Sequence, residues 1–365
     1  MSLLHQIALS CIPGIGSILA RNLITYCGSP EEVFATKEKH LSRVPGIGAK
    51  TVELIRHHNA FERAQKELSF IEKYDIQALF LTDINYPKRL KNCFDAPVML
   101  YFKGNADLNA GKVISIVGTR KATEYGKDIC RELVAGLAVH SPLIVSGLAY
   151  GIDFLAHKEA LRNSISTIGI MAHGLDRIYP PQHRSIAEKM IADGGLLTEF
   201  MSGTVPDREN FPKRNRIIAG LADVTIVVEA NIRGGALITA ELANSYNRDV
   251  FAYPGRISDE FSSGCNHLIK TNRANLITKL IDLEYILGWA ENSTSSAVTQ
   301  QLSLAIDVSA EERTIMDVLQ AKGSLTVDDL AIFTKYPQSK LSVYILGMEM
   351  KGILTVMPGK VYKLS

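Results

Sequence analysis

Three cations precede an apolar run in the segment FPKRNRIIAGLADVTIVVEA (211–230), namely Lys213, Arg214 and Arg216. The run VTIVV (224–228) is rich in β-branched residues, which predicts a buried strand. Cations near the end of a sheet are suited to bind an anion, and the ring of Phe211 beside them can stack on a base. We therefore predict a turn that faces a polyanion with flat groups, anchored in the core by Ile217 and Ile218.

A second anion-binding candidate is VGTRKATEYG (117–126), which directly follows the predicted strand VISIV (113–117). Gly118 permits a tight turn at a strand-helix junction, where doubly wound sheets bind phosphates. Arg120 can contact a phosphate through two parallel hydrogen bonds. No Gly-x-Gly-x-x-Gly motif follows any predicted strand, so we expect no dinucleotide cofactor.

The segment SGLAYGIDFLAH (146–157) also follows a predicted strand, and Ser146, Gly147 and Gly151 offer hydroxyl and backbone donors there. Asp153 and His157 are four residues apart, which places them on one helix face. Such a pair suits catalysis or a metal, but no third ligand is evident, so we predict a structural hydrogen-bonded pair and no metal site.

Two further polar loops, HGLDRIYPPQHR (173–184) and RGGALITAE (233–241), follow predicted strands as well. Since the carboxyl ends of parallel strands meet at one edge of a sheet, we expect all these loops to converge there.

The motif PGIG occurs twice near the N-terminus, within 11–24 and 43–55. A Gly-x-Gly turn between helices points backbone N–H groups outward and is typical of helix-hairpin-helix units that bind a DNA phosphate. The candidate contacts are Gly14, Gly16, Gly46, Gly48 and Lys50. The alternative is a helical packing module that makes no DNA contact.

The elements that must position these residues follow from the apolar patterns. Runs at 113–117, 143–147, 166–171, 196–200, 224–228 and 249–253 alternate with amphipathic stretches. This predicts an α/β fold with a doubly wound, Rossmann-like, mostly parallel sheet over 76–290. Residues 1–75 are predicted to form a helix-hairpin-helix (SAM-like) domain, 291–308 a linker and 309–365 a winged helix.

Composition limits the function. Forty Lys and Arg oppose 38 Asp and Glu among 365 residues, so nucleic-acid binding would have to rest on local clusters. The five scattered cysteines indicate reduced thiols and a cytoplasmic protein. No apolar stretch reaches the roughly 20 residues of a membrane span.

The order of motifs resembles the DprA/Smf family of bacterial DNA-processing proteins. The matching segments lie between about 87 and 270: YPKRLK, IVGTRKATEYG, VSGLAYGID, AHGLDRIYP, LLTEF, FPKRNRIIAGLADVTIVVEA, GALITAELA and SSGCNHLI. The resemblance implies a non-catalytic homodimer that binds and protects incoming single-stranded DNA and loads the RecA recombinase in natural transformation. Single-strand-binding protein is a further partner that it allows.

The resemblance also implies which residues bind DNA. These are Arg120, the segment FPxRNR with Phe211, Arg214, Asn215 and Arg216, and the upstream cation Arg208, with Gly118 and Ser146 to Gly151 in adjoining loops. The chain departs from the family where Gly234-Gly235-Ala236 replaces Ser-Gly-Ser, which removes two hydroxyls, and where Arg273-Ala274 replaces Gly-Ala.

Two other functions compete with this interpretation. RGGALITAE also resembles the glycine-rich loop of lysine-decarboxylase-like phosphoribohydrolases, in which case Glu241 would be catalytic and Arg120 a phosphate clamp. That family carries Gly-Thr where this chain has Leu237-Ile238-Thr239. A duplex-DNA regulator would use the winged helix, but its third helix carries few cations, which favours a protein-interaction or packing module.

Overall fold

The computed structural model describes residues 2–57, 59–289, 308–357 and 361–364. The chain divides into two compact units, Met1–Thr278 and Lys279–Ser365.

Among the described residues of the first unit, one sheet has the strand order β1-β2-β6-β5-β4-β3-β7-β8-β9. The strands are β1 (Gln77–Phe80), β2 (Met99–Gly104), β3 (Val113–Val117), β4 (Leu143–Ser146), β5 (Thr167–Ile170), β6 (Gly195–Thr198), β7 (Val224–Val227), β8 (Asp249–Ala252) and β9 (Asn275–Leu276). Neighbours from β6 to β9 pair in parallel, whereas β1 and β2 pair antiparallel at one edge. This confirms the predicted mostly parallel, doubly wound sheet.

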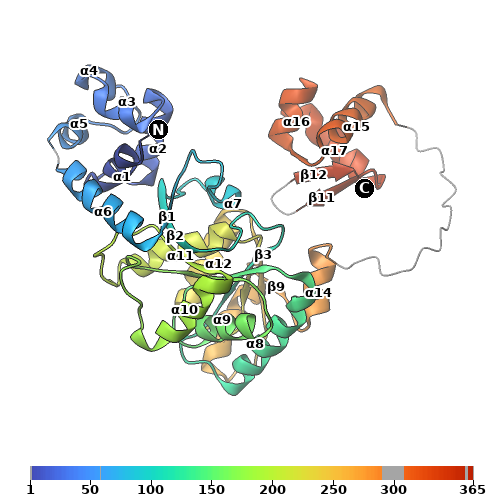
Figure 1. Ribbon diagram of the computed structural model, residues 1–365. Coiled ribbons are helices and arrows are strands. Elements are labelled where there is room, and N and C mark those ends of the chain that lie inside the picture. Colours follow the sequence, from blue (N-terminus) through green and yellow to red (C-terminus); the bar gives the residue numbers. More distant parts are fainter. Residues whose placement is uncertain (1, 58, 290–307, 358–360, 365) are drawn as a thin grey trace. The chain divides into compact units, whose positions relative to one another are not determined.

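Helices cover both faces of the sheet (Figure 1). On one face lie α8 (Glu124–Leu137), α9 (Ile152–Arg162) and α10 (Arg184–Asp193), and on the other lie α11 (Asn210–Leu221) and α12 (Gly235–Ser245). The central strands are buried on both faces, which explains their continuous apolar runs. The chain builds outward from β3 through β4 to β6 and then restarts beside β3 with β7, so the strand order reverses between β3 and β7.

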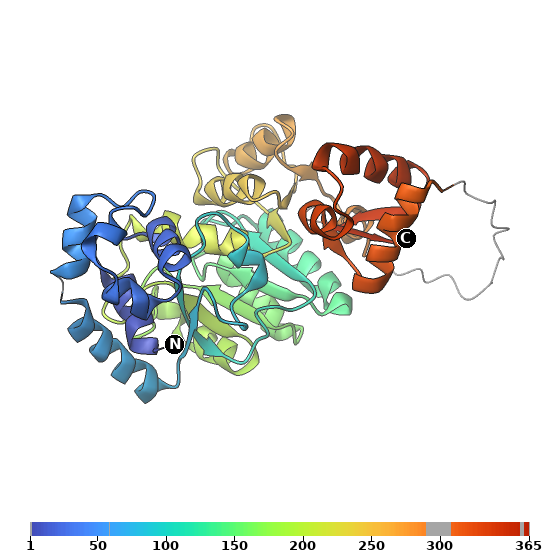
Figure 2. The ribbon, with the colours of Figure 1, turned by 90° about the horizontal axis from the view of Figure 1, so that it is seen from above.

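In the described residues before β1 the helices are α1 (Leu3–Cys11), α2 (Ser17–Cys27), α3 (Pro30–Ala35), α4 (Glu38–Leu41), α5 (Ala49–Arg56) and α6 (Ala60–Tyr74). Both PGIG turns carry a left-handed glycine, Gly14 and Gly46. These helices belong to the same compact unit as the sheet, and α1 contacts β2 (Figures 1 and 2). The buried carboxylate of Glu67 on α6 accepts hydrogen bonds from the Ser202 backbone N (3.0 Å) and Oγ (2.6 Å), just beyond β6.

The second unit contains α14 (Leu280–Ile286), α15 (Ala310–Lys322), β10 (Leu325–Thr326), α16 (Val327–Thr334), α17 (Gln338–Met350), β11 (Leu354–Met357) and β12 (Val361–Leu364). Its three described strands pair in the order β10-β12-β11. Three helices and a C-terminal strand pair occur in the predicted order, and the winged-helix assignment stays a prediction. The predicted linker lies outside the described residues except for Val308, and so does the predicted turn at Pro358-Gly359.

The element at 211–216 differs from the prediction. These residues belong to the first two turns of α11 and do not form a turn between elements. Ile217 and Ile218 are buried, as expected for the anchor of this segment.

Candidate nucleic-acid interface

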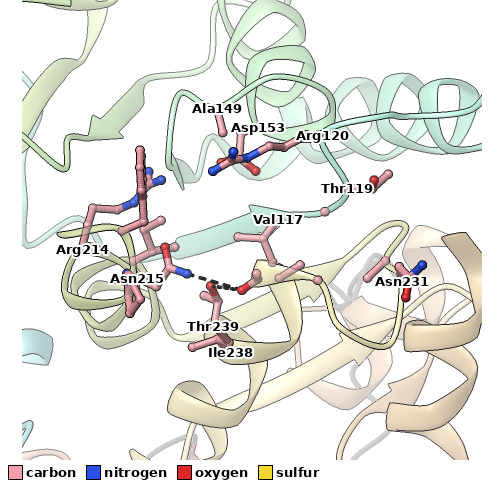
Figure 3. Close-up of a pocket in the computed structure, with 18 of the residues that line it drawn as sticks. Val117, Thr119, Arg120, Ala149, Asp153, Arg214, Asn215, Asn231, Ile238 and Thr239 are labelled. Carbon is pink, nitrogen blue, oxygen red and sulfur yellow. Dashed lines mark hydrogen bonds between the residues drawn. The ribbon is translucent and has the colours of Figure 1, made fainter. Parts of the chain in front are cut away.

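A cavity of about 750 Å³ opens at the carboxyl ends of the strands, where the strand order reverses. Its walls come from the loops after β3, β4, β5, β6 and β7 and from α9, α11 and α12 (Figure 3). The predicted convergence of the strand-end loops is therefore confirmed by their shared cavity.

The loop after β3 places an exposed arginine at the cavity. Gly118 packs so closely that a Cβ there would lie 2.5 Å from the Ile152 side chain and 2.9 Å from the carbonyl oxygen of Glu229. The Thr119 N–H donates to the same carbonyl at 2.6 Å, which fixes the turn. Arg120 then extends from a rigid support, and its guanidinium carbon lies 5.3 Å from the ring centroid of Phe211.

The loop after β4 supports the cavity through its packing, and DNA contacts from its residues stay a prediction. The buried Ser146 hydroxyl donates to the Ile116 carbonyl at 2.6 Å, so it does not face the cavity. Gly147 leaves no room for a Cβ because the Arg214 guanidinium packs against it. Gly151 packs against the Thr119 carbonyl and couples this loop to the preceding one. None of these three residues lines the main cavity.

The three predicted cations lie on different faces of helix α11, and only Arg214 among them lines the cavity. Phe211, Arg214 and Asn215 line the cavity, and Asn215 Nδ2 donates to the Gly235 carbonyl at 3.4 Å (Figure 3). Lys213 is exposed outside the cavity lining. Arg216 turns away, because it forms an ion pair with Glu199 and donates to the Asp95 carbonyl. The expectation that all three cations face the ligand is therefore wrong for Lys213 and Arg216.

Arg214 is the electrostatic centre of the cavity floor. Its side chain is buried, and Nη1 donates to the Ile170 carbonyl at 2.8 Å. Burial lowers the pKa of Arg214 to about 10, although the nearby Asp153 carboxylate favours the charged form. Burial likewise raises the pKa of Asp153, and the Arg214 charge opposes this. At neutral pH the guanidinium stays charged, and the adjacent Asp153 carboxylate is its buried partner below the cavity.

Three exposed arginines surround the cavity: Arg120, Arg208 and Arg233. None of them forms an ion pair with a carboxylate among the described residues, although Asp207 and Glu209 flank Arg208 in the sequence. Arg208 was predicted, whereas Arg233 was missed. The sequence pattern that could have identified Arg233 is a cation directly before Gly234-Gly235 in a loop that follows a buried strand.

Aromatic rings complete the cavity. The Tyr179 ring, which the sequence prediction missed, lies 6.4 Å from the Phe211 ring between centroids at an interplanar angle of 47°. Arg120 and Arg214 both lie near the Phe211 ring, at 5.3 and 6.0 Å from its centroid. The cavity thus combines a flat apolar surface with several positive charges.

The predicted hydrogen-bonded pair of Asp153 and His157 is wrong. His157 Nδ1 instead lies 2.7 Å from Thr167 Oγ1 on β5. Burial lowers the pKa of His157 to about 3, so the imidazole is neutral. The described residues contain no group of three or more His, Cys, Asp or Glu side chains arranged to hold a metal ion.

The competing catalytic assignment places Glu241 near the ligand, but Glu241 does not line the cavity and forms an ion pair with Arg273. That ion pair also means that Arg273, the cation noted as a departure, is neutralised locally. The altered loop Gly234-Gly235-Ala236 does line the cavity, with backbone rather than hydroxyl groups.

The helix-hairpin-helix residues lie outside the cavity lining. Gly16 and Gly48 immediately precede α2 and α5, and a Cβ at either would meet no atom within 4 Å. Gly14 and Gly46 form the turns, and Lys50 is exposed. Both hairpins therefore leave open the approach that a phosphate would need, which keeps the DNA-contact and packing alternatives open. No helix in the described part of the chain is both long and apolar enough to cross a bilayer.

Comparisons with known proteins agree with this architecture. Residues 77–287 match the family described as DNA recombination-mediator protein A, and residues 7–57 match the SAM-like helix-hairpin-helix tandem. Protein Smf of Synechocystis is 38% identical over 292 residues, which is 78% of this chain and 72% of that protein. DNA processing protein DprA of Streptococcus pneumoniae is 43% identical over 198 residues, which is 54% of this chain and 70% of the relative.

Two solved structures are similar as well. The X-ray structure of DprA from Streptococcus pneumoniae has a TM-score of 0.67 at 32% identity and covers 78% of this chain and 98% of its own. A structure of DprA from Helicobacter pylori, described for its single-stranded DNA binding mode, has a TM-score of 0.54 at 30% identity and covers 59% and 97%.

Proposed function

Since this chain belongs to the family of DNA recombination-mediator protein A, we propose that it binds single-stranded DNA in the cavity beside β3 and β7 without catalysing a reaction. In this proposal the protein protects incoming single strands and loads the RecA recombinase on them during natural transformation. It acts as a cytoplasmic homodimer and cooperates with single-strand-binding protein.

The observation that carries the proposal is that Arg120, Arg208 and Arg233 line one cavity together with the ring of Phe211. The arginines release counterions from the phosphates of a bound strand, which makes the affinity depend on salt. Phe211 and Tyr179 offer ring faces to bases, and stacking contributes roughly 1–3 kcal/mol per base. The base faces of a duplex are already stacked, so this cavity favours single strands. The similar DprA from Helicobacter pylori is a single-stranded DNA binder, which supports the same ligand here.

The lack of catalysis is proposed from the cavity's acidic groups. Among the described residues that line the cavity, Asp153 is the one acidic residue. The buried Arg214 charge lies beside it. A general acid or base must reach the reacting atoms, and Asp153 is engaged at the floor. The rival phosphoribohydrolase reaction predicts release of free base from a nucleoside monophosphate. Base release by the purified protein, lost in Glu241→Gln, would support that rival.

The direct test is a titration of matched single-stranded and duplex oligonucleotides over a range of salt concentrations. We expect a preference for the single strand, and the three rim arginines should contribute about 2 to the slope of log affinity against log salt. The variant Arg120→Ala/Arg208→Ala/Arg233→Ala should lose this part of the slope. Preference for duplex, or an unchanged slope in the triple variant, would contradict the proposed site.

The recombination role needs its own assay. RecA filament formation on single strands covered by single-strand-binding protein should accelerate when this protein is added. An identical time course with and without the protein would exclude RecA loading while leaving single-strand binding intact.

A further inference from the structure

We propose that a bound strand continues past Arg120 into a second groove over α8 and α9, which serves as an additional phosphate-binding subsite. This inference rests on the proposed function and extends the binding site beyond the cavity.

The groove has a volume of about 460 Å³ and is lined by the first two turns of α8 and of α9. These two helices pack side by side (Figure 1). Its charged and aromatic lining consists of Arg120, Lys121, Lys127, Arg131, Tyr150, Phe154 and Lys158. Arg120 lines both the groove and the main cavity. Tyr150 lines the groove and a small pocket that also contains Phe211. A path of shared residues therefore connects the Phe211 ring with the second groove.

The charges of the groove suit a polyanion. No carboxylate lines it, and Lys121 and Lys158 are exposed without an ion-pair partner among the described residues. Lys127 and Arg131 each pair with an acid one turn earlier on α8, Lys127 with Glu124 and Arg131 with Asp128. These pairs are partly exposed, so they cost little to exchange for phosphate.

The cations extend along the helices instead of converging on one point. Lys127 and Arg131 are separated by four residues, or about 6 Å along the axis of α8. Lys158 lies on the neighbouring helix α9. A single free phosphate would need donors that meet at one centre, whereas a row of charges matches successive phosphates of an extended strand.

Aromatic groups at the edge of the groove add a surface for bases. The Phe154 ring stacks on His183 with centroids 4.3 Å apart and an interplanar angle of 28°. The half-exposed Tyr150 is held by a 3.0 Å hydrogen bond from its hydroxyl to Gln182 Oε1. Interleaved cations and fixed rings are the pattern of sequence-independent single-strand binding.

The test compares the double variant Lys121→Ala/Lys158→Ala with wild type on oligothymidylates of about 4 and about 16 nucleotides. Two lost phosphate contacts should lower the salt slope for the longer strand by about 1.4 and its affinity on the order of tenfold at about 0.1 M salt. The short strand, which fits the main cavity, should bind the variant and wild type equally. The matched control is Lys189→Ala/Lys270→Ala, which removes two exposed lysines outside both grooves.

The outcomes separate the two proposals. Loss confined to the longer strand supports the second groove. Unchanged binding of both strands, or equal loss on both strands, overturns it and leaves single-strand binding by the main cavity standing. Failure of wild type to bind either strand overturns the proposed function itself.

Discussion

Arg214 is one of the predicted DNA contacts, but we expect the variant Arg214→Met to destabilise the first unit as well. The Arg214 side chain is buried, donates to the Ile170 carbonyl and offsets the buried charge of Asp153. Removing one member of a buried pair of opposite charges typically costs about 3–5 kcal/mol, because the other charge is left uncompensated. That is a large part of the roughly 5–15 kcal/mol that keeps a domain folded.

The pH dependence of this loss identifies its cause. Burial already raises the pKa of Asp153 above its ordinary value, and removing Arg214 should raise it further. A carboxyl whose folded pKa is raised contributes stability below its unfolded pKa and loses it as pH rises through the folded pKa. The stability difference between Arg214→Met and wild type should therefore be smaller at about pH 5 than at about pH 8.

Urea unfolding of the full chain, followed by far-ultraviolet circular dichroism, measures this difference. The double variant Arg214→Met/Asp153→Asn should recover part of the lost stability. It should also abolish the added pH dependence, because it lacks the Asp153 carboxyl. Lys213→Met is the matched control, since it removes an exposed cation from the same helix and should change stability by less than about 0.5 kcal/mol. A loss below about 1 kcal/mol in Arg214→Met, or no recovery in the double variant, would refute the reasoning.

Three other predictions follow from the same geometry. Arg120→Ala should lower single-strand affinity about tenfold and the salt slope by about 0.7 without changing stability, whereas Lys213→Ala should leave both binding quantities within error in the same titration. Phe211→Ala should weaken single-strand binding by roughly 1–3 kcal/mol and Phe211→Tyr should retain it, and equal affinities of the two variants would exclude stacking. His157 binds its proton with a pKa of about 3 when folded and about 6.5 when unfolded, so stability should fall as pH drops below about 6.5, by about 2 kcal/mol at about pH 5. Urea midpoints should show that His157→Gln is less acid-sensitive than wild type, and equal sensitivity would assign the acid loss to other groups.

The strands of the parallel sheet were predictable because both of their faces are buried. The runs at 113–117 and 224–228 coincide with β3 and β7 within one residue, since a buried parallel strand needs continuous apolar side chains. Strands β1, β2 and β9 were not predicted. Both residues of β9 are exposed and it is only two residues long, so its pairing with β8 depends on the position of the preceding helix rather than on a local pattern.

The location of the site at one edge of the sheet could be predicted from the sequence, but its side chains could be predicted only in part. Loops after parallel strands must meet at one edge, so Gly118, Arg120 and Arg233 were brought together by topology. The partners of Ser146 and Arg214 were not predictable. Their acceptors are the carbonyls of Ile116 and Ile170, which are distant in sequence and are defined only by the pairing of strands.

The positions of the three cations depend on whether residues 211–216 form a turn or a helix. A turn at 211–216 would place Lys213, Arg214 and Arg216 together, but a helix separates side chains by about 100° per residue. Positions 211, 214, 215 and 218 then share a face, and these four residues line the cavity. Lys213 and Arg216 fall on other faces, where Arg216 forms an ion pair with Glu199, the residue that follows β6. Arg216→Ala should therefore lower stability more than single-strand affinity, in contrast to Arg120→Ala. Equal binding losses in the two variants, measured in the same titration, would show that Arg216 leaves Glu199 to reach the strand.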